Sequence, residues 1–213
     1  MSKRRNFVLN IVPITFDDGF TNDITSPEAI LYNNNMADRI IWLDYEVDDS
    51  CTDIAKWIIR WNIEDSGKPV EERKKIKIVI ATNGGDLDVT TAIRDAIMLS
   101  ETPVVTINIS KAYSAGFYIY IAADERYCFP NSTFLIHQGA GQFGGSFREI
   151  VSQIENYQDQ IGKLGDYIVE RTGITPQMYI DKAEDEWFVT ANESVDLGIS
   201  TGVIGSLGDI LWN

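Results

Sequence analysis

The feature that most constrains the fold of this chain is a pair of apolar segments joined by a short stretch of small residues. Residues 104–109 are rich in β-branched side chains and predict a buried strand. Residues 117–123 are apolar on every face and predict a helix inside the core rather than on the surface. Ser114 lies between the two segments, where the strand ends and the helix begins. We take this junction as the centre around which the other elements are arranged.

Strand and helix patterns alternate on both sides of the junction. Strands are predicted at residues 39–43, 76–81, 126–129, 133–137 and 187–190, and helices at residues 53–63, 87–99, 175–183 and 191–198. This alternation favours parallel strands joined by right-handed crossovers, and 213 residues fit one large domain. We therefore predict one α/β domain over residues 39–213. An N-terminal arm over residues 1–38 precedes it and carries a short helix at 26–32, with Ser26 as its N-cap.

The longest helix is predicted at residues 147–171, after a segment at 139–145 that contains four glycines. Its apolar residues recur about every 3.5 positions, a spacing that suits a partner helix. Two explanations of so long a helix are open at this point. One is an arm that lies on its own domain, and the other is a contact between subunits.

Charge and composition narrow the choice of partners. A net charge of −14 argues against nucleic acid and anionic membranes, and the basic cluster at 73–75 with Lys77 is interpreted as a solvated loop rim. We find no apolar run long enough to cross a bilayer and expect no signal peptide. Cys51 and Cys128 lack metal-ligand spacing, and the chain has one histidine. We therefore expect no metal or cofactor on this chain, and reduced, half-buried thiols in a cytoplasmic protein.

The single histidine, His137, ends the predicted strand at 133–137 and adjoins the glycine-rich segment. A serine attacks a carbonyl group when a base removes its proton, and a neutral imidazole is the usual base. Ser114 and His137 are therefore candidates for nucleophile and base. Structural roles are also open: Ser114 as the N-cap of the helix that follows it, and His137 as a core or surface histidine.

An imidazole base needs an acid that orients it, and a developing oxyanion needs two hydrogen-bond donors. The candidate acids are Asp181, Glu184, Asp185 and Glu186. The candidate donors are the backbone amides of Gly84 and Gly85, in the turn after the strand at 76–81, and the amide of Ala115. Charged runs at helix ends are commonly solvated, and paired glycines are common in turns. The ordered set of glycines, serine, histidine and acid is what points to hydrolysis.

This set resembles the proteolytic subunit of the caseinolytic (Clp) protease, a self-compartmentalising serine peptidase with a crotonase-like fold. The matching motifs are Asn83-Gly84-Gly85, Ala112-Tyr113-Ser114-Ala115-Gly116, Cys128-Phe129-Pro130-Asn131-Ser132, Leu135-Ile136-His137-Gln138 and Phe188-Val189-Thr190-Ala191-Asn192-Glu193-Ser194. The resemblance extends over residues 39–204. It implies stacked parallel strands with crossover helices and a protruding handle over residues 139–172.

The resemblance also implies roles for individual residues. The nucleophile would be Ser114, the general base His137, and the oxyanion-hole donors the amides of Gly85 and Ala115. The family's third member is an Asp two positions before the Phe that matches Phe188, and this chain has Glu186 there. Glutamate serves this role in other serine hydrolases, so we assign Glu186 to it, with Asp185 as the runner-up.

The same resemblance implies an assembly. Residues 147–171 would be the handle helix through which two heptameric rings stack into a tetradecamer, with 139–145 as the strand that precedes it, and residues 1–35 would form the axial arm. An ATP-driven unfoldase of the AAA+ type would feed unfolded polypeptides into the chamber, so ATP would be used by the partner and not by this chain.

Two other functions compete with this one. One is a catalytically impaired structural or regulatory ring subunit. Glu186 favours it, because the family has Asp at this position, whereas the retained Ser114 and His137 oppose it. A crotonase-fold acyl-CoA enzyme would use the amides of Gly85 and Ala115 to hold an enolate. That chemistry usually requires carboxylates at the active centre, so it ranks last.

Overall fold

The computed structural model describes residues 26–183 and 185–208. The predicted axial arm lies mostly outside these residues. The strands are β1 (Ile40–Leu43), β2 (Ile76–Thr82), β3 (Val104–Tyr113), β4 (Glu125–Cys128), β5 (Thr133–Ile136), β6 (Trp187–Thr190) and β7 (Gly202–Val203). The α-helices are α1 (Pro27–Ala37), α2 (Thr52–Glu64), α3 (Leu87–Met98), α4 (Ala115–Tyr120), α5 (Phe147–Arg171), α6 (Pro176–Ala183) and α7 (Ala191–Asp196). Short 3₁₀ helices span Asp49–Cys51 and Val70–Glu72.

The strands form a single sheet in which β3 is the branch point. Strands β1, β2, β3, β4 and β7 pair in parallel in that order, as the predicted crossovers require. The first half of β3 pairs with β4, and its second half pairs in parallel with β5, where Tyr113 lies beside Leu135. At the fork the buried Asn108 donates a side-chain hydrogen bond to the carbonyl of Thr133 (2.9 Å). The fork brings the end of β5 beside the end of β3.

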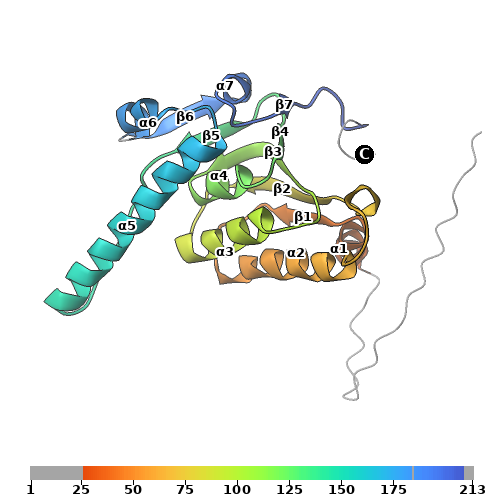
Figure 1. Ribbon diagram of the computed structural model, residues 1–213, viewed down its shortest axis with the longest axis horizontal. Helices are drawn as coiled ribbons and strands as arrows, with labels where there is room; N and C mark the ends of the chain where they lie inside the picture. Colours follow the sequence, from red (N-terminus) through yellow and green to blue (C-terminus); the bar gives the residue numbers. More distant parts are fainter. Residues whose placement is uncertain (1–25, 184, 209–213) are drawn as a thin grey trace, which may run out of the picture.

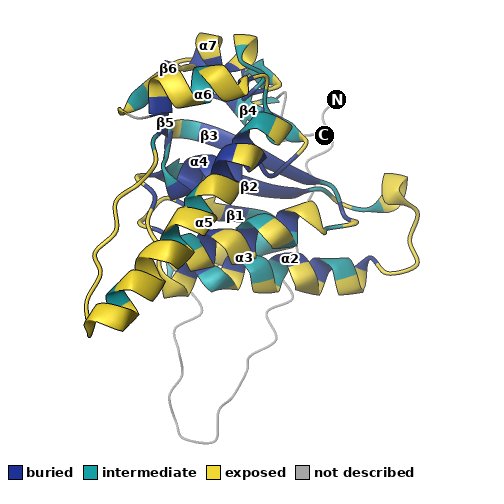
Figure 2. Cartoon of the chain, turned by 60° about the vertical axis from the view of Figure 1, so that its left-hand side comes forward, coloured by how far each residue is buried: buried dark blue, intermediate teal, exposed yellow. Residues whose placement is uncertain are grey.

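Helices α2 and α3 cover one side of the sheet, and α4 lies between α3 and the sheet (Figure 1). Every residue of α4 is buried, which confirms the prediction of a core helix (Figure 2). Helices α6 and α7 lie with β6 on the opposite side of the molecule from α2 (Figure 1). The helix that carries Ser114 at its start is therefore enclosed by the core.

Helix α5 is present over the predicted residues, and its first half projects away from the body (Figure 1). Its buried residues all lie in the second half: Leu164, Gly165, Tyr167 and Ile168. In the first half Phe147 is 82% exposed, and Val151 and Ile154 are also exposed. The prediction of a strand at 139–145 is wrong for the described chain. That segment is irregular and is tied to α5 by side-chain bonds, such as that from Gln153 Nε2 to the carbonyl of Gly144 (3.2 Å).

Three other expectations need correction. The helix predicted at 26–32 continues to Ala37, although Ser26 is its N-cap as expected. The thiols of Cys51 and Cys128 are fully buried rather than half-buried, and both are free. The cluster at 73–75 with Lys77 is not a solvated rim throughout, because Lys77 belongs to β2 and is 7% exposed. Burial lowers the pKa of the Lys77 ammonium group.

Candidate active site

Ser114 lies at the sharp turn from β3 into α4. Its backbone has φ 52° and ψ −119°, a conformation that is rare for a residue with a side chain. The turn is held from both sides: the Ser114 amide donates to the carbonyl of Leu135 (3.0 Å), and the Ser114 carbonyl accepts from the amide of Phe117 (2.9 Å). The Ser114 side chain makes no capping bond to α4. The N-cap interpretation is therefore not supported, and the hydroxyl is available for other chemistry.

The Gly84-Gly85 turn after β2 packs directly against Ser114. Gly84 has φ 102°, and a Cβ atom there would lie 2.8 Å from the Cβ of Ser114. Gly85 has φ 151°, and a Cβ atom there would overlap the carbonyl oxygen of Val47. Val47 clamps the turn through two backbone bonds, to the carbonyl of Gly84 (2.9 Å) and from the amide of Asp86 (2.8 Å). Only glycine fits either position.

The backbone amides of Gly85 and Ala115 are free to donate hydrogen bonds to a ligand. Neither amide donates a hydrogen bond to any other residue in the described part of the chain. Ala115 is the first residue of α4, so its amide belongs to the helix start that has no intrahelical acceptor. The two amides flank Ser114 and match the donor pair that an oxyanion requires.

His137 follows the last residue of β5 and reaches the same place from a distant part of the chain. It lines, with Ser114 and Gly85, a small cavity of about 50 Å³. The remaining lining residues are Leu87, Tyr118, Gln138, Gly139, Ala140, Tyr157 and Ile161. The Nε2 atom of His137 is buried and has no hydrogen-bond partner among the described residues. A buried, unpartnered imidazole nitrogen beside a free hydroxyl is suited to accept a proton.

The structure does not bring a predicted acid into hydrogen-bond contact with His137. Strand β6 pairs antiparallel with β5, and Ile136 lies opposite Trp187. One further step in this register places Glu186 opposite His137. The side chains of Glu186 and Asp185 are exposed, and neither bonds to His137. Asp181 accepts instead from Gln177 Nε2 within α6 (2.7 Å), and Glu184 lies outside the described residues.

Two tyrosines in the cavity wall were not singled out from the sequence. The hydroxyl of Tyr118 is within 3.4 Å of the His137 carbonyl, and that of Tyr157 donates to the Gln138 carbonyl (3.3 Å). Burial is the main cause that raises the pKa of the Tyr118 hydroxyl well above its ordinary value, and burial also raises the pKa of Tyr157. Both hydroxyls therefore stay protonated and act as donors. The available signal was the spacing, because Tyr118 follows Ser114 by one helical turn.

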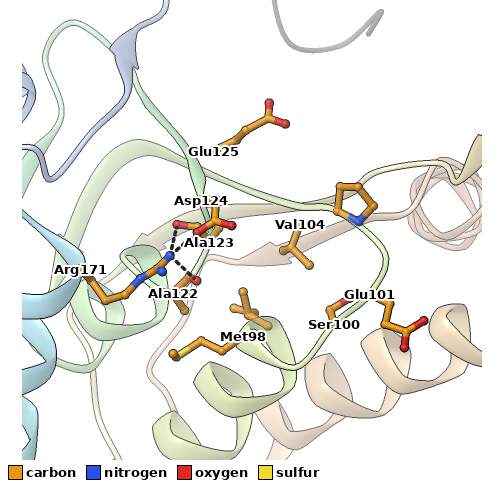
Figure 3. A pocket seen from close by; sticks show the side chains of 11 residues that line it. Met98, Ser100, Glu101, Val104, Ala122, Ala123, Asp124, Glu125 and Arg171 are labelled. Carbon is orange, nitrogen blue, oxygen red and sulfur yellow. Dashed lines mark hydrogen bonds and ion pairs between the residues drawn. The ribbon is translucent and has the colours of Figure 1, made fainter. Parts of the chain in front are cut away.

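A larger cavity of about 350 Å³ lies at the other end of α4 (Figure 3). Its wall includes Arg171, whose guanidinium donates to the carbonyls of Ala122 and Ala123 (both 3.0 Å) and to the carboxylate of Asp124 (2.7 Å) (Figure 3). The wall of this cavity includes no histidine, and its serine, Ser100, donates its hydroxyl to the Thr102 carbonyl (2.6 Å). Arg171 binds the carbonyls that follow α4, and Ser114 lies at the opposite end of that helix.

No group of His, Cys, Asp and Glu side chains in the described part of the chain is arranged to hold a metal ion. No helix there is both long enough and apolar enough to span a membrane.

Comparisons with known proteins point to one family. The family model described as Clp protease matches residues 26–206. The ATP-dependent Clp protease proteolytic subunit 1 of Leifsonia xyli is 33% identical over 79% of this chain and 84% of its own length. The ATP-dependent Clp protease proteolytic subunit 2 of Bifidobacterium longum is 30% identical over 81% of this chain and 82% of its own length.

The solved structure of a point mutant of ClpP1 from Listeria monocytogenes shares the fold. It superposes with a TM-score of 0.72 and covers 85% of this chain and 99% of its own chain, at 23% identity. The predicted α/β fold of the Clp proteolytic subunit, with its parallel sheet, is thereby confirmed.

Proposed function

Because this chain belongs to the Clp protease family, we propose that it is a serine endopeptidase subunit that hydrolyses peptide bonds of unfolded polypeptides. The observation that carries the proposal at the level of residues is the shared cavity of Ser114 and His137, which are 23 positions apart in the chain. The unused amides of Gly85 and Ala115 flank the same serine. Nucleophile, base and anion donors are thus within reach of one substrate carbonyl.

The chemistry follows from these positions. The Ser114 hydroxyl attacks the peptide carbonyl while His137 Nε2 accepts the hydroxyl proton. The amides of Gly85 and Ala115 donate to the tetrahedral oxyanion, where each such donor is commonly worth about 3 kcal/mol of transition-state stabilisation. The imidazolium then protonates the leaving amine, and an acyl-enzyme remains. Water, activated by the same imidazole, releases the acyl group and restores Ser114.

Glu186 is the acid that we assign to the orientation of His137. Its support is that His137 and Glu186 each adjoin the last residue pair of β5 and β6, Ile136 and Trp187. A bond from the carboxylate to Nδ1 would fix the tautomer that leaves Nε2 free to accept. Asp185 is the alternative acid, although adjacent residues of an extended segment point to opposite sides.

We further propose that the chain acts in an assembly of two stacked heptameric rings fed by an AAA+ unfoldase, with ATP used by the unfoldase and no cofactor on this chain. The support is the projecting first half of α5, where Phe147, Val151 and Ile154 form an exposed apolar stripe. Such a stripe is costly in water and suits a facing helix. Both cysteines are free thiols, as is usual in a reducing compartment such as the cytoplasm.

A catalytically impaired ring subunit is the second candidate, and one observation favours it. The carboxylate of Glu186 is exposed and makes no bond to His137. An acyl-CoA enzyme is disfavoured, because the residues that line the Ser114 cavity include no carboxylate that could act on an enolate.

Labelling with a fluorophosphonate probe separates these candidates. The wild-type chain should label at Ser114 and should cleave a fluorogenic peptide. Ser114→Ala should do neither, and Ser110→Ala, which changes an exposed serine of β3, should behave as wild type. A wild-type chain that neither labels nor cleaves would establish the impaired subunit, and labelling that persists in Ser114→Ala would overturn the assignment of the nucleophile.

A further inference from the structure

The β3–β5 ladder ends at the site, and its last hydrogen bond comes from a side chain. The parallel pairing continues to Tyr113 and Leu135, and the amide of Ser114 then donates to the Leu135 carbonyl (3.0 Å). In a parallel ladder alternate carbonyls of one strand face the same neighbour, so the next acceptor is the His137 carbonyl. Strand β3 cannot supply the next donor, because the chain turns into α4 at Ser114.

The Tyr118 hydroxyl takes the place of that missing donor, with its oxygen 3.4 Å from the His137 carbonyl oxygen. Ser114 directly precedes α4, and Tyr118 lies in the first turn of that helix. The start of α4 therefore binds the Leu135 carbonyl through the Ser114 backbone amide and the His137 carbonyl through the Tyr118 hydroxyl. From this geometry we propose that Tyr118 is a positioning residue, whose hydroxyl holds the main chain of His137 at the distance from Ser114 that proton transfer requires.

Helix α5 holds the main chain of Tyr118 through a hydrogen bond. The hydroxyl of Tyr167 donates to the Tyr118 carbonyl (3.3 Å), and the Arg94 guanidinium lies over the Tyr167 ring at 5.0 Å. The hydroxyl of Tyr157, also from α5, donates to the next carbonyl after His137, that of Gln138 (3.3 Å). Two consecutive carbonyls are thus bound by tyrosines from two helices. These bonds hold the main chain at His137 and leave the orientation of its ring to other contacts.

The chain offers a matched control in Tyr179 of α6. Its hydroxyl is also buried but has no hydrogen-bond partner in the described part of the chain. Its ring lies against Gly165, where a Cβ atom would come within 2.8 Å of the ring. Tyr179→Phe therefore removes a buried hydroxyl from the same region without the loss of a bond, whereas Tyr118→Phe removes a hydroxyl that holds the histidine.

The inference rests on the proposed peptidase function, so its test has one readout that requires turnover and one that does not. With a fluorogenic peptide, Tyr118→Phe should lower kcat about 3- to 30-fold and leave KM within about twofold, because a misplaced base affects the chemical step more than binding. Tyr167→Phe should lower kcat in the same direction by a smaller factor. Tyr179→Phe should match the wild type.

The second readout uses the fact that His137 is the only histidine in the chain. In a tag-free protein labelled at histidine Cε1, the wild type and Tyr179→Phe should each give one sharp NMR signal, while Tyr118→Phe should give a broadened or split signal. A wild type without turnover would refute the peptidase function, and this signal would still decide the role of Tyr118. The inference is overturned if Tyr118→Phe keeps the wild-type signal and kcat, or if Tyr179→Phe loses as much kcat as Tyr118→Phe. Should Tyr118→Phe fail to fold, an unchanged kcat and signal in Tyr167→Phe would overturn it.

Discussion

His137 and Glu186 each lie one position beyond Ile136 and Trp187, the last residue pair of the antiparallel strands β5 and β6. The proposed base and the proposed acid thus adjoin the same end of this strand pair, although the carboxylate of Glu186 is exposed. A glutamate side chain is one methylene longer than an aspartate side chain. From the same backbone position it can therefore bridge a longer gap to the imidazole.

We predict that Glu186→Gln lowers kcat on a peptide substrate by about 10²- to 10⁴-fold, because an amide cannot hold the imidazole in the tautomer that leaves Nε2 free. Asp185→Asn serves as the control and should stay within about threefold of the wild type. The measurement is steady-state hydrolysis of a fluorogenic peptide by the assembled protein. The reverse ranking of the two variants would transfer the role to Asp185, and full activity in both would leave a Ser–His dyad.

The Gly84-Gly85 turn gives a second prediction. Gly85→Ala should abolish peptide hydrolysis, because its Cβ atom would overlap the Val47 carbonyl oxygen and would displace the Gly85 amide. Gly67→Ala is the control: Gly67 also has a positive φ, of 81°, but no atom lies within 4 Å of the added Cβ. It should cost only about 1 kcal/mol of stability and leave kcat unchanged. An active Gly85→Ala variant would show that this amide does not contact the oxyanion.

The apolar periodicities predicted most of the fold, since they depend on local sequence. The strand at 104–109 and the helix at 147–171 are where the pattern placed them. The pattern missed the last four residues of β3, residues 110–113, because the last three of them pair with β5, which is distant in the sequence. Burial of Lys77 was missed for a different reason: its charge groups it with the basic loop residues 73–75, although it lies within the predicted strand at 76–81.

Less of the candidate site than of the fold could be predicted from the sequence. Ser114, His137 and Gly85 carry chemistry or special backbone geometry that is visible in a sequence, and the fold brings them together. Tyr118 and Tyr157 look like ordinary core aromatics until their hydroxyls are placed near the carbonyls of His137 and Gln138. The spacing from Ser114 suggests that Tyr118 is near the site, but the contact of its hydroxyl with the His137 carbonyl depends on the fork of β3.

A buried ion pair leads to a prediction about stability and pH. Asp65 is 1% exposed and pairs with Arg39, with Lys68 Nζ (2.8 Å) and with the Thr102 hydroxyl (3.0 Å). Asp65→Asn should lower the free energy of unfolding by about 3 kcal/mol, because the buried Arg39 would keep only its longer ion pair with the exposed Glu64 (3.6 Å). The control is Asp53→Asn, which breaks an exposed pair with Lys56 and should cost less than about 1 kcal/mol. Denaturant unfolding at equal protein concentration measures both, and equal losses would contradict the prediction.

The ion pair of Asp65 and Arg39 also determines how the free energy of unfolding changes with pH. Hydrogen bonding to Arg39 is the main cause that holds the pKa of Asp65 well below its usual range. The ionised Asp65 therefore contributes fully to the free energy of unfolding above the unfolded pKa of about 3.9. This contribution is lost as the pH falls from there toward the pKa of the folded state. The difference in unfolding free energy between the wild type and Asp65→Asn should be constant from pH 7 to pH 5 and should shrink below about pH 4. A difference that grows with acidity would contradict this assignment.

The last prediction concerns the projecting half of α5. Replacement of Phe147, Val151 and Ile154 by Ser should dissociate the proposed stacked rings into single rings, because these side chains form one exposed apolar stripe that a facing helix would bury. Asn156→Ser, on the other side of the helix, should leave the assembly intact. Particle mass in solution measures the outcome, and circular dichroism checks that α5 stays helical. If the triple variant keeps the wild-type mass, the rings do not stack through this stripe; if wild type itself is a single ring, the stripe serves another contact.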